Sequence, residues 1–240
     1  MSKTNELKEL KAKLFELQDE EYKQLQSSLI PNMPESRIIG VRIPDLRKLA
    51  KTYVKEKGAV VLDFMHTLPH FYLEGETLHM LFIELESDPE VILENLDEVL
   101  PTLTNWASAD TGSFKAIMKN KELSLKYINK WLNSDYTYAN RFAIRLLKEF
   151  FLEDEYEEKY LDRVARINTN EYYIQLMVAW YIAEALVKQY DDAVKLLEDG
   201  VLELNTHNEA INKAIDSHRI PDETKAYLKT LRREGGALKR

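Results

Sequence analysis

The sequence predicts an all-α protein in which helical hairpins follow one another and form a solenoid with a concave binding face. Apolar residues recur at helical spacing nearly everywhere, most clearly in "AIRLLKEFFL" and "YIQLMVAWYIAEALVKQY", and no stretch shows the alternation of a strand. The breaks between these segments are short and polar, such as "LESDPE" and "INTNEYY". Helical pairs that recur at a fixed period are the signature of a solenoid.

The repeat is found by placing the helix that follows each break. These helices are expected to begin near Glu74, Asn105, Tyr138, Tyr172 and Asn208, about 31 to 36 residues apart. Partner helices are expected between them, over residues 89–100, 121–132, 155–167 and 191–204. In an α-solenoid one helix of each pair forms the outer layer and the other lines the concave surface. We therefore expect a single domain over residues 1–233, with about five or six helical pairs, and a flexible tail over residues 234–240.

Composition limits the class of protein. The chain has 240 residues, 45% hydrophobic and 31% charged, as in a globular protein rather than a disordered one. It contains no cysteine, which excludes disulfides, thiolate metal sites and cysteine nucleophiles. The first residues alternate charge with leucine, without the apolar core of a signal peptide, and no apolar run is long enough to span a membrane. We expect a cytoplasmic protein.

The net charge of −8 argues on its own against a polyanionic partner, but the charges are sorted by segment. Residues 37–57 carry seven bases and two acids, whereas residues 84–98 carry seven acids and no base. Residues 149–162 carry seven acids and one base. The acidic segments fall mostly on the partner helices, so we expect them to face outward and the inner surface to be neutral to positive.

Three successive inner helices each carry two functional side chains on one face, four or seven residues apart. The pairs are Trp106 and Asp110, Arg141 and Arg145, and Tyr173 and Trp180. Stacked in parallel register, these helices would bring tryptophan, aspartate and arginine onto one concave patch. Lys115 adds a further base to the inner helices.

Each of these residues also has a structural interpretation. Trp106 and Trp180 are suited to packing between helices. Arg145 lies four residues before Glu149 and is placed to pair with it. Asp110 precedes "TGS" and could cap a helix at a break.

A segment with two histidines is the candidate metal site. His66, His70 and Glu74 have the spacing of ligands on one helical face, but Pro69 interrupts that helix, so we expect no metal. Glu76, close by in a loop-to-helix junction, could help to cap the helix.

Six segments, in their order and spacing, resemble a known family. They are "IIGVRIPDLRKLAK", "YLEGETLHMLFIE", "NWASAD", "NRFAIRLL", "YYIQLMVAWYIAEAL" and "NKAIDSHRIPDETKAYLKTLR". Together they resemble the bacterial DNA alkylation repair family of AlkD-like DNA glycosylases, whose fold is a HEAT-like helical repeat. The resemblance runs along nearly all of the chain.

The resemblance implies roles for four residues. In that family a Trp-x-x-x-Asp pair supplies the catalytic aspartate and one wall of the site, and Trp106 and Asp110 match this motif. The family's arginine before "AI" matches Arg141, and its tryptophan in "AW" matches Trp180. Asp110 is thus expected to be catalytic, and the other three to bind substrate. The residues expected at the DNA backbone are Arg145, Lys115 and Tyr173.

The implied function is hydrolysis of the N-glycosidic bond of cationic N-alkylated purines in duplex DNA, without base flipping. A carboxylate can stabilise the oxocarbenium-like transition state and orient water, and a cationic base leaves without a general acid. We expect a monomer that binds alkylated double-stranded DNA, with no cofactor, metal or membrane partner. The alternatives are a non-catalytic DNA-binding module and a protein scaffold of the same helical-repeat class, and the net charge favours the scaffold.

Overall fold

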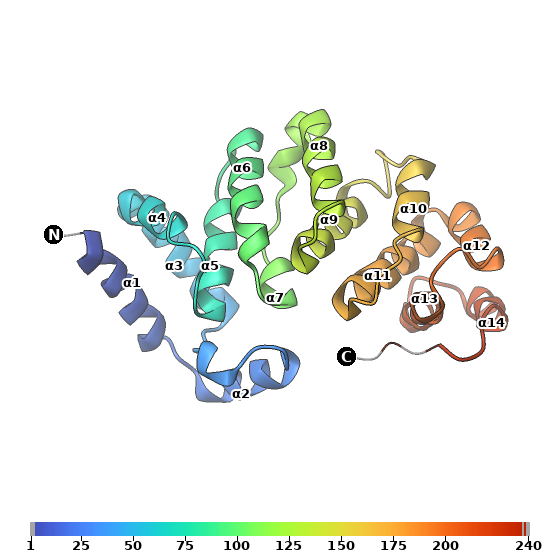
Figure 1. The fold of residues 1–240 in the computed structure, drawn as a ribbon, viewed down its shortest axis with the longest axis horizontal. Helices are drawn as coiled ribbons and strands as arrows, with labels where there is room; N and C mark the ends of the chain where they lie inside the picture. The colour runs from blue at the N-terminus through green and yellow to red at the C-terminus, as the bar shows by residue number, and fades with distance from the viewer. Residues whose placement is uncertain (1–2, 237, 239–240) are drawn as a thin grey trace. The chain divides into compact units, whose positions relative to one another are not determined.

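The structure, a computed structural model, describes residues 3–236 and 238 (Figure 1). Over these residues it contains fourteen α-helices, three short 3₁₀ segments and no strand, which confirms the all-α prediction. The chain divides into two compact units, residues 1–127 and 128–240, and the boundary falls within α8 (Lys121–Leu132). The expectation of a single domain over residues 1–233 stays a prediction.

Unit 1 is built around α5. Its helices are α1 (Lys3–Glu16), α2 (Glu20–Leu29), α3 (Ile43–Glu56), α4 (Gly58–Met65), α5 (Leu73–Glu84), α6 (Pro89–Val99) and α7 (Trp106–Ala109). Its 3₁₀ segments are η1 (Glu35–Arg37), η2 (Leu100–Thr102) and η3 (Lys115–Asn120). Helix α5 packs against α3, α6 and α7, and every residue from Leu73 to Ile83 is buried. A helix buried on all sides is the centre of its unit.

Glu74, one of the buried residues of α5, binds the backbone of the segment before α3. Glu74 is 1% exposed, and its carboxylate accepts the backbone N–H groups of Ile39 (3.0 Å), Gly40 (2.7 Å) and Val41 (3.2 Å). Gly40 has φ +94°, and a Cβ there would lie 2.6 Å from the carbonyl oxygen of Asp19. A buried charge is tolerated when it is hydrogen-bonded in this way.

Unit 2 is two layers of helices. Besides the end of α8 it contains α9 (Thr137–Phe150), α10 (Glu158–Ala165), α11 (Tyr172–Lys188), α12 (Tyr190–Glu198), α13 (Leu204–Asp216) and α14 (Asp222–Thr230). Helix α11 packs between α9 and α13, while α10 and α12 pack against α11 and against each other (Figure 1). Because it has neighbours on several sides, α11 is apolar nearly all round.

The observed helices follow the predicted order, with one difference in length. The partner helices expected over residues 89–100, 121–132, 155–167 and 191–204 correspond to α6, α8, α10 and α12. Four inner helices, α5, α9, α11 and α13, begin within four residues of the expected starts. The fifth, α7, begins one residue after Asn105 but is a single turn of 4 residues. Gly112, at φ +86°, turns the chain three residues after α7 ends.

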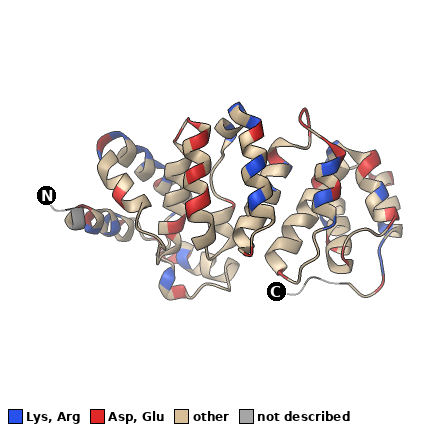
Figure 2. Cartoon of the chain, turned by 45° about the horizontal axis from the view of Figure 1, so that its top comes forward, with Lys and Arg blue, Asp and Glu red and all other residues tan. Residues whose placement is uncertain are grey.

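Charge is sorted by helix in unit 1. Glu90, Glu94 and Glu98 are exposed at successive turns of α6, and Figure 2 shows acidic residues repeated along this helix. On α3 three exposed charges are lysines, Lys48, Lys51 and Lys55, and the fourth is Glu56 at the end of the helix. These positions agree with the segregation read from the sequence.

The described end of the chain contacts α13. Of the expected tail, residues 237, 239 and 240 lie outside the described residues, whereas the side-chain amide of Asn208 donates to the carbonyl of Gly236 (3.2 Å). In the described part of the chain, no helix has the length and apolar character needed to cross a membrane.

His79 of α5 and His70, which precedes α5, form a buried pair. Nε2 of His70 lies 2.9 Å from Nδ1 of His79, so one ring donates and the other accepts. The His70 ring also stacks on Phe64, with centroids 4.3 Å apart. Burial lowers the pKa of His70 to about 4, and burial together with the neighbouring histidines lowers the pKa of His79 to about 3. Both rings are therefore neutral at pH 7.

We expect the free energy of unfolding to fall as the pH drops below about 6.5. In the unfolded chain the two histidines bind protons near pH 6.5, but in the folded protein their pKa values are about 4 and about 3, so protons favour unfolding between these limits. At about 1.4 kcal/mol per pH unit for each ring, the loss by pH 5 is about 2–4 kcal/mol. Urea titrations at several pH values measure it.

The control for this prediction is the exposed His218. His79→Gln should remove about half of the pH dependence, because one of the two titrating rings is gone, whereas His218→Gln should keep all of it. If the free energy of unfolding falls with pH equally in the native chain and in both variants, the buried pair does not titrate as described.

Candidate functional site

Helix α7 holds Trp106 and Asp110 in fixed relation. Its N-cap, Asn105, is fully buried and accepts the N–H of Ser108 through its side-chain oxygen (2.8 Å). Asp110 is the C-cap, and its N–H donates to the carbonyl of Trp106 (2.9 Å). The single turn therefore keeps the i, i+4 relation expected from the sequence, and both side chains are partly exposed.

Glu76 of α5 holds the residues that precede this turn. Its side chain is 0% exposed, and its carboxylate accepts the N–H (3.0 Å) and hydroxyl (2.6 Å) of Thr104 and the side-chain amide of Asn105 (2.8 Å). Arg37 adds an ion pair at 3.5 Å. Burial raises the pKa of Glu76, and the bonds from Thr104 and the charge of Arg37 oppose that rise. Glu76 thus anchors the start of α7 rather than capping its own helix.

A second acid of α5 holds the segment that follows the turn. Glu84 accepts the N–H of Ser113 through Oε1 (2.9 Å) and forms an ion pair with Arg47 of α3. At Gly112 a Cβ would lie 2.8 Å from the Phe114 ring, and the positive φ already favours glycine. Helix α7 is therefore attached to α5 on both sides.

Trp106 packs on the connection between α2 and α3. Its indole Nε1 donates to the carbonyl of Leu29 (3.2 Å), and its ring lies against a small apolar cluster. The buried members of this cluster are Ile30, Met33, Ile38 and Leu73. Trp106 thus has the packing role that the sequence left open, while part of its ring stays accessible.

Asp110 does not cap the N-terminus of α7. A carboxylate is stabilising at the N-terminus of a helix, where the free N–H groups lie, and Asp110 lies at the C-terminal end of α7 instead. The structural interpretation of Asp110 as a cap at the break that begins with Thr111 stays open.

Arg141 of α9 and Trp180 of α11 lie together in unit 2. The guanidinium carbon is 5.7 Å from the centroid of the Trp180 ring, and Nη1 donates to the carbonyl of Tyr173 (2.8 Å). Arg141 is only 1% exposed. The guanidinium is thus largely removed from solvent, and the substrate-binding role expected of Arg141 stays a prediction.

The three residues expected at the DNA backbone differ in exposure. Arg145 is 6% exposed and donates to Glu149 (2.8 Å), the ion pair that the sequence left open as an alternative. Tyr173 is half-buried, its ring edge-on to Tyr172 with centroids 5.1 Å apart. Lys115, the first residue of η3, is exposed.

The predicted residues fall into two groups. Trp106, Asp110 and Lys115 belong to unit 1. Arg141, Arg145, Tyr173 and Trp180 belong to unit 2. Trp106 is brought together with Asp110, and Arg141 with Tyr173 and Trp180. The convergence of both groups on one patch stays a prediction.

Two lysines beside Trp180 were not anticipated. The Nζ atoms of Lys148 and Lys213 lie 5.5 and 5.7 Å from the centroid of its ring. Lys148 follows Arg141 by seven residues, the spacing of one helical face, and Lys213 follows Trp180 by 33, one repeat period. Both signals were therefore present in the sequence.

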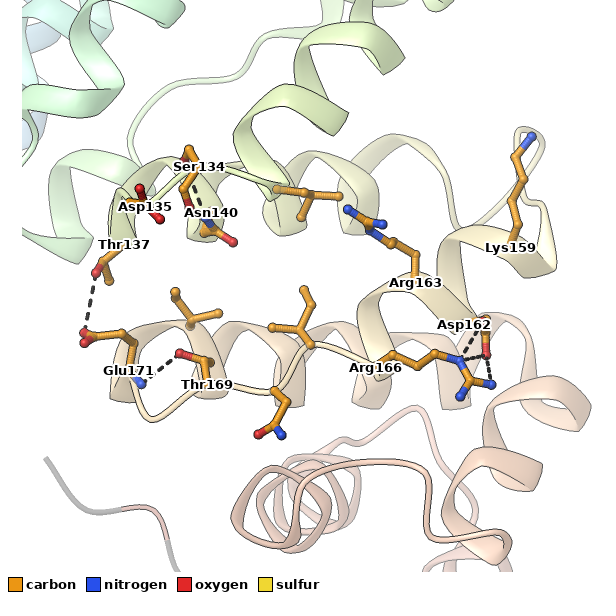
Figure 3. A pocket seen from close by; sticks show the side chains of 14 residues that line it. Ser134, Asp135, Thr137, Asn140, Lys159, Asp162, Arg163, Arg166, Thr169 and Glu171 are labelled. Carbon is orange, nitrogen blue, oxygen red and sulfur yellow. Dashed lines mark hydrogen bonds and ion pairs between the residues drawn. The ribbon is translucent and has the colours of Figure 1, made fainter.

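A cavity of about 700 Å³ in unit 2 contains none of the expected residues. On one side it is lined by the connection between α8 and α9. On the other side it is lined by α10 and by the segment between α10 and α11 (Figure 3). Two of its basic side chains are already engaged, because Arg166 pairs with Asp162 (2.7 Å) and Arg163 donates to Asn133. Its charges compensate one another, and we assign it no function.

The histidine segment does not gather ligands for a metal. Among the described residues there is no group of three or more His, Asp or Glu side chains placed to hold a metal ion. The carboxylate of Glu74, one of the three candidate ligands, is occupied by backbone N–H groups.

Comparison with known proteins agrees with the resemblance seen in the sequence. A family model described as "DNA alkylation repair enzyme" matches residues 10–216. No curated protein matched the chain. The matched range includes Trp106, Asp110, Arg141 and Trp180, and it extends across both units. The chain therefore belongs to the DNA alkylation repair enzyme family, which places it in the repair of alkylation damage to DNA.

Proposed function

We propose that this protein is a DNA glycosylase that hydrolyses the N-glycosidic bond of cationic N-alkylated purines in duplex DNA. The observation that carries the proposal is the anchored turn α7, where Trp106 and Asp110 are partly exposed while Glu76 and Glu84 fix the chain on either side. Catalytic groups act by being held in place before the reaction, and a doubly anchored turn provides this. Family membership supports alkylated DNA as the substrate class.

In the proposed reaction Asp110 acts on the sugar rather than on the base. As the C1′–N bond breaks, its electron pair moves to the purine and neutralises the positive charge of the alkylated ring. The base leaves as a neutral molecule and needs no general acid. The positive charge that develops on the sugar is stabilised by the Asp110 carboxylate, which also orients the attacking water. Water adds to C1′ and loses a proton, and an abasic site remains.

The other residues position the substrate. Trp106 offers an aromatic face beside the cationic nucleotide, and Trp180, in unit 2, offers an aromatic face to DNA. Because Arg141 is 1% exposed, we assign it to positioning: its contacts with Trp180 and the Tyr173 carbonyl hold the ring and the start of α11. Lys115, which is exposed, keeps the role of a phosphate contact.

We propose that recognition depends on the charge of the lesion and on the DNA backbone, so the base need not be flipped. A non-catalytic DNA-binding protein would use the same exposed Trp106 and Lys115. A protein scaffold is favoured by a different observation, the row of exposed glutamates on α6. Base release separates the enzyme from both alternatives.

Asp110→Asn should slow base release by about 10²-fold or more. The substitution keeps the shape of the side chain but removes the charge that stabilises the transition state. Single-turnover release of the base from a duplex carrying N7-methylguanine measures the effect. Duplex affinity and the thermal midpoint should stay close to those of the native chain, because asparagine is tolerated at a helix end.

The matched control is Asp154→Asn, which removes the same charge from an exposed loop of unit 2 and should release base at the native rate. Native-rate release by the Asp110→Asn variant would refute the catalytic role of Asp110. Absence of release by the native chain, with duplex binding intact, would favour the non-catalytic alternative.

Lys115→Ala should reduce the salt dependence of duplex binding. Loss of one phosphate contact lowers the slope of log K against log salt by about 0.9, with little dependence on DNA sequence. Lys126→Ala, at an exposed position on partner helix α8 of the same unit, should leave the slope unchanged. Equal slopes for the Lys115 and Lys126 variants would remove Lys115 from the DNA contact.

Arg141→Ala should destabilise the fold by about 1–3 kcal/mol, because a buried hydrogen bond is lost.

A further inference from the structure

Three cationic groups surround the ring of Trp180. The guanidinium carbon of Arg141 and the Nζ atoms of Lys148 and Lys213 lie 5.7, 5.5 and 5.7 Å from its centroid. Each distance is within reach of a cation–π contact. Positive charges around one ring also repel one another, so a phosphate bound among them would reduce this repulsion.

The cations come from helices on both sides of Trp180. Arg141 and Lys148 lie on one face of α9, and Lys213 projects from α13. Trp180 lies on α11, which packs between these two helices. The cluster is therefore produced by the layer of unit 2 itself and not by a loop.

A cavity of about 220 Å³ opens beside the ring. Its polar and aromatic lining consists of Lys148, Trp180, Glu184, Lys213, Ser217 and Arg219. Around the ring and the cavity there are four bases, with Arg141 included, against Glu184 and the Glu209 that pairs with Lys213 at 3.5 Å. The surroundings of Trp180 thus carry a positive excess although the whole chain is acidic.

The acid within the cavity is already compensated. Glu184 accepts from Arg219 (2.9 Å) and pairs with Lys188 (3.3 Å), and the bond from Arg219 lowers the pKa of Glu184. The charge of Glu184 is therefore directed at Arg219 and Lys188 rather than at the lysines beside the ring.

We propose that the cavity beside Trp180 is a phosphate site, in which Lys148, Lys213 and the Ser217 hydroxyl hold a DNA backbone phosphate. Phosphate oxygens take charge-assisted hydrogen bonds from ammonium groups, and about 220 Å³ admits one such group. Trp180 then contacts the sugar-phosphate backbone, because the protein's own cations repel a cationic base from this ring. The assignment of the phosphate to DNA rests on the proposed function.

The test compares two pairs of substitutions in the full chain. Lys148→Gln with Lys213→Gln removes both ammonium groups from Trp180. The matched control, Lys159→Gln with Lys195→Gln, removes ammonium groups that are 65% and 66% exposed on α10 and α12 of the same unit. Affinity for an undamaged duplex is measured over a salt titration, together with the thermal midpoint.

The first pair should reduce the slope of log K against log salt by about 0.9, the equivalent of one phosphate contact, and weaken binding about fivefold at physiological salt. The control pair should change neither. Should the double variant lower the thermal midpoint, each single variant should reduce the slope in the same direction, by less than about 0.9. A neutral methylphosphonate placed at the linkage that this site holds should weaken binding by the native chain. It should not weaken binding by the double variant further.

Several results would overturn the proposal. Equal effects from both pairs, or none from the first, would show that the cavity does not bind DNA. Tighter binding or faster base release by the first pair would show that the ring holds the cationic base. Calorimetric binding of inorganic phosphate with an unchanged DNA slope would assign the site to another anion. Absence of base release together with the expected slope change would instead refute only the glycosylase function.

Discussion

The acids of α5 are the constraint on which unit 1 depends. Glu74, Glu76 and Glu84 each accept hydrogen bonds from a different segment: the chain before α3, the residues before α7 and the loop after it. An isolated helical turn is unstable in water, because its single hydrogen bond does not offset the entropy lost by ordering it. Helix α7 therefore persists because α5 holds both of its flanks. Each buried N–H left without its acceptor would cost about 1–3 kcal/mol, which makes these acids structural requirements for the placement of Trp106 and Asp110.

An acidic protein can act on DNA if its charges are sorted over distances longer than the screening length. At physiological ionic strength this length is about 8 Å, so exposed acids farther away than this hardly oppose a phosphate bound elsewhere. In unit 1 three exposed glutamates lie along α6, whereas α3 exposes three lysines and one glutamate. In unit 2 the cations gather around Trp180. The net charge of −8 therefore says less about the partner than the local arrangement does.

Much of the fold could be predicted from the sequence because helical periodicity and polar breaks are local signals. The positions of α5, α9, α11 and α13 follow from them. The brevity of α7 does not, because it depends on Gly112 and on acids of another helix. At the candidate site, the i, i+4 relation of Trp106 and Asp110 could be predicted from their spacing. The burial of Arg141 could not, because it is decided by the packing of α9 against α11. The functional roles of these residues stay predictions. The proximity of Lys148 and Lys213 to Trp180 could not be predicted from their spacing alone, because it depends on the packing of α11 between α9 and α13.

The most direct test of this account is amide hydrogen exchange in the Glu76→Gln variant, since its central claim is that Glu76 holds the turn bearing Trp106 and Asp110. Glutamine replaces an accepting oxygen with a donor that faces the donors of Thr104 and Asn105. Loss of one or two charge-assisted bonds, at about 1.5–3 kcal/mol each, should speed exchange over residues 104–110 by about tenfold or more. Exchange in α11 and at Ile39 to Val41, which Glu74 holds, should not change. Unchanged protection of residues 104–110 would contradict the account.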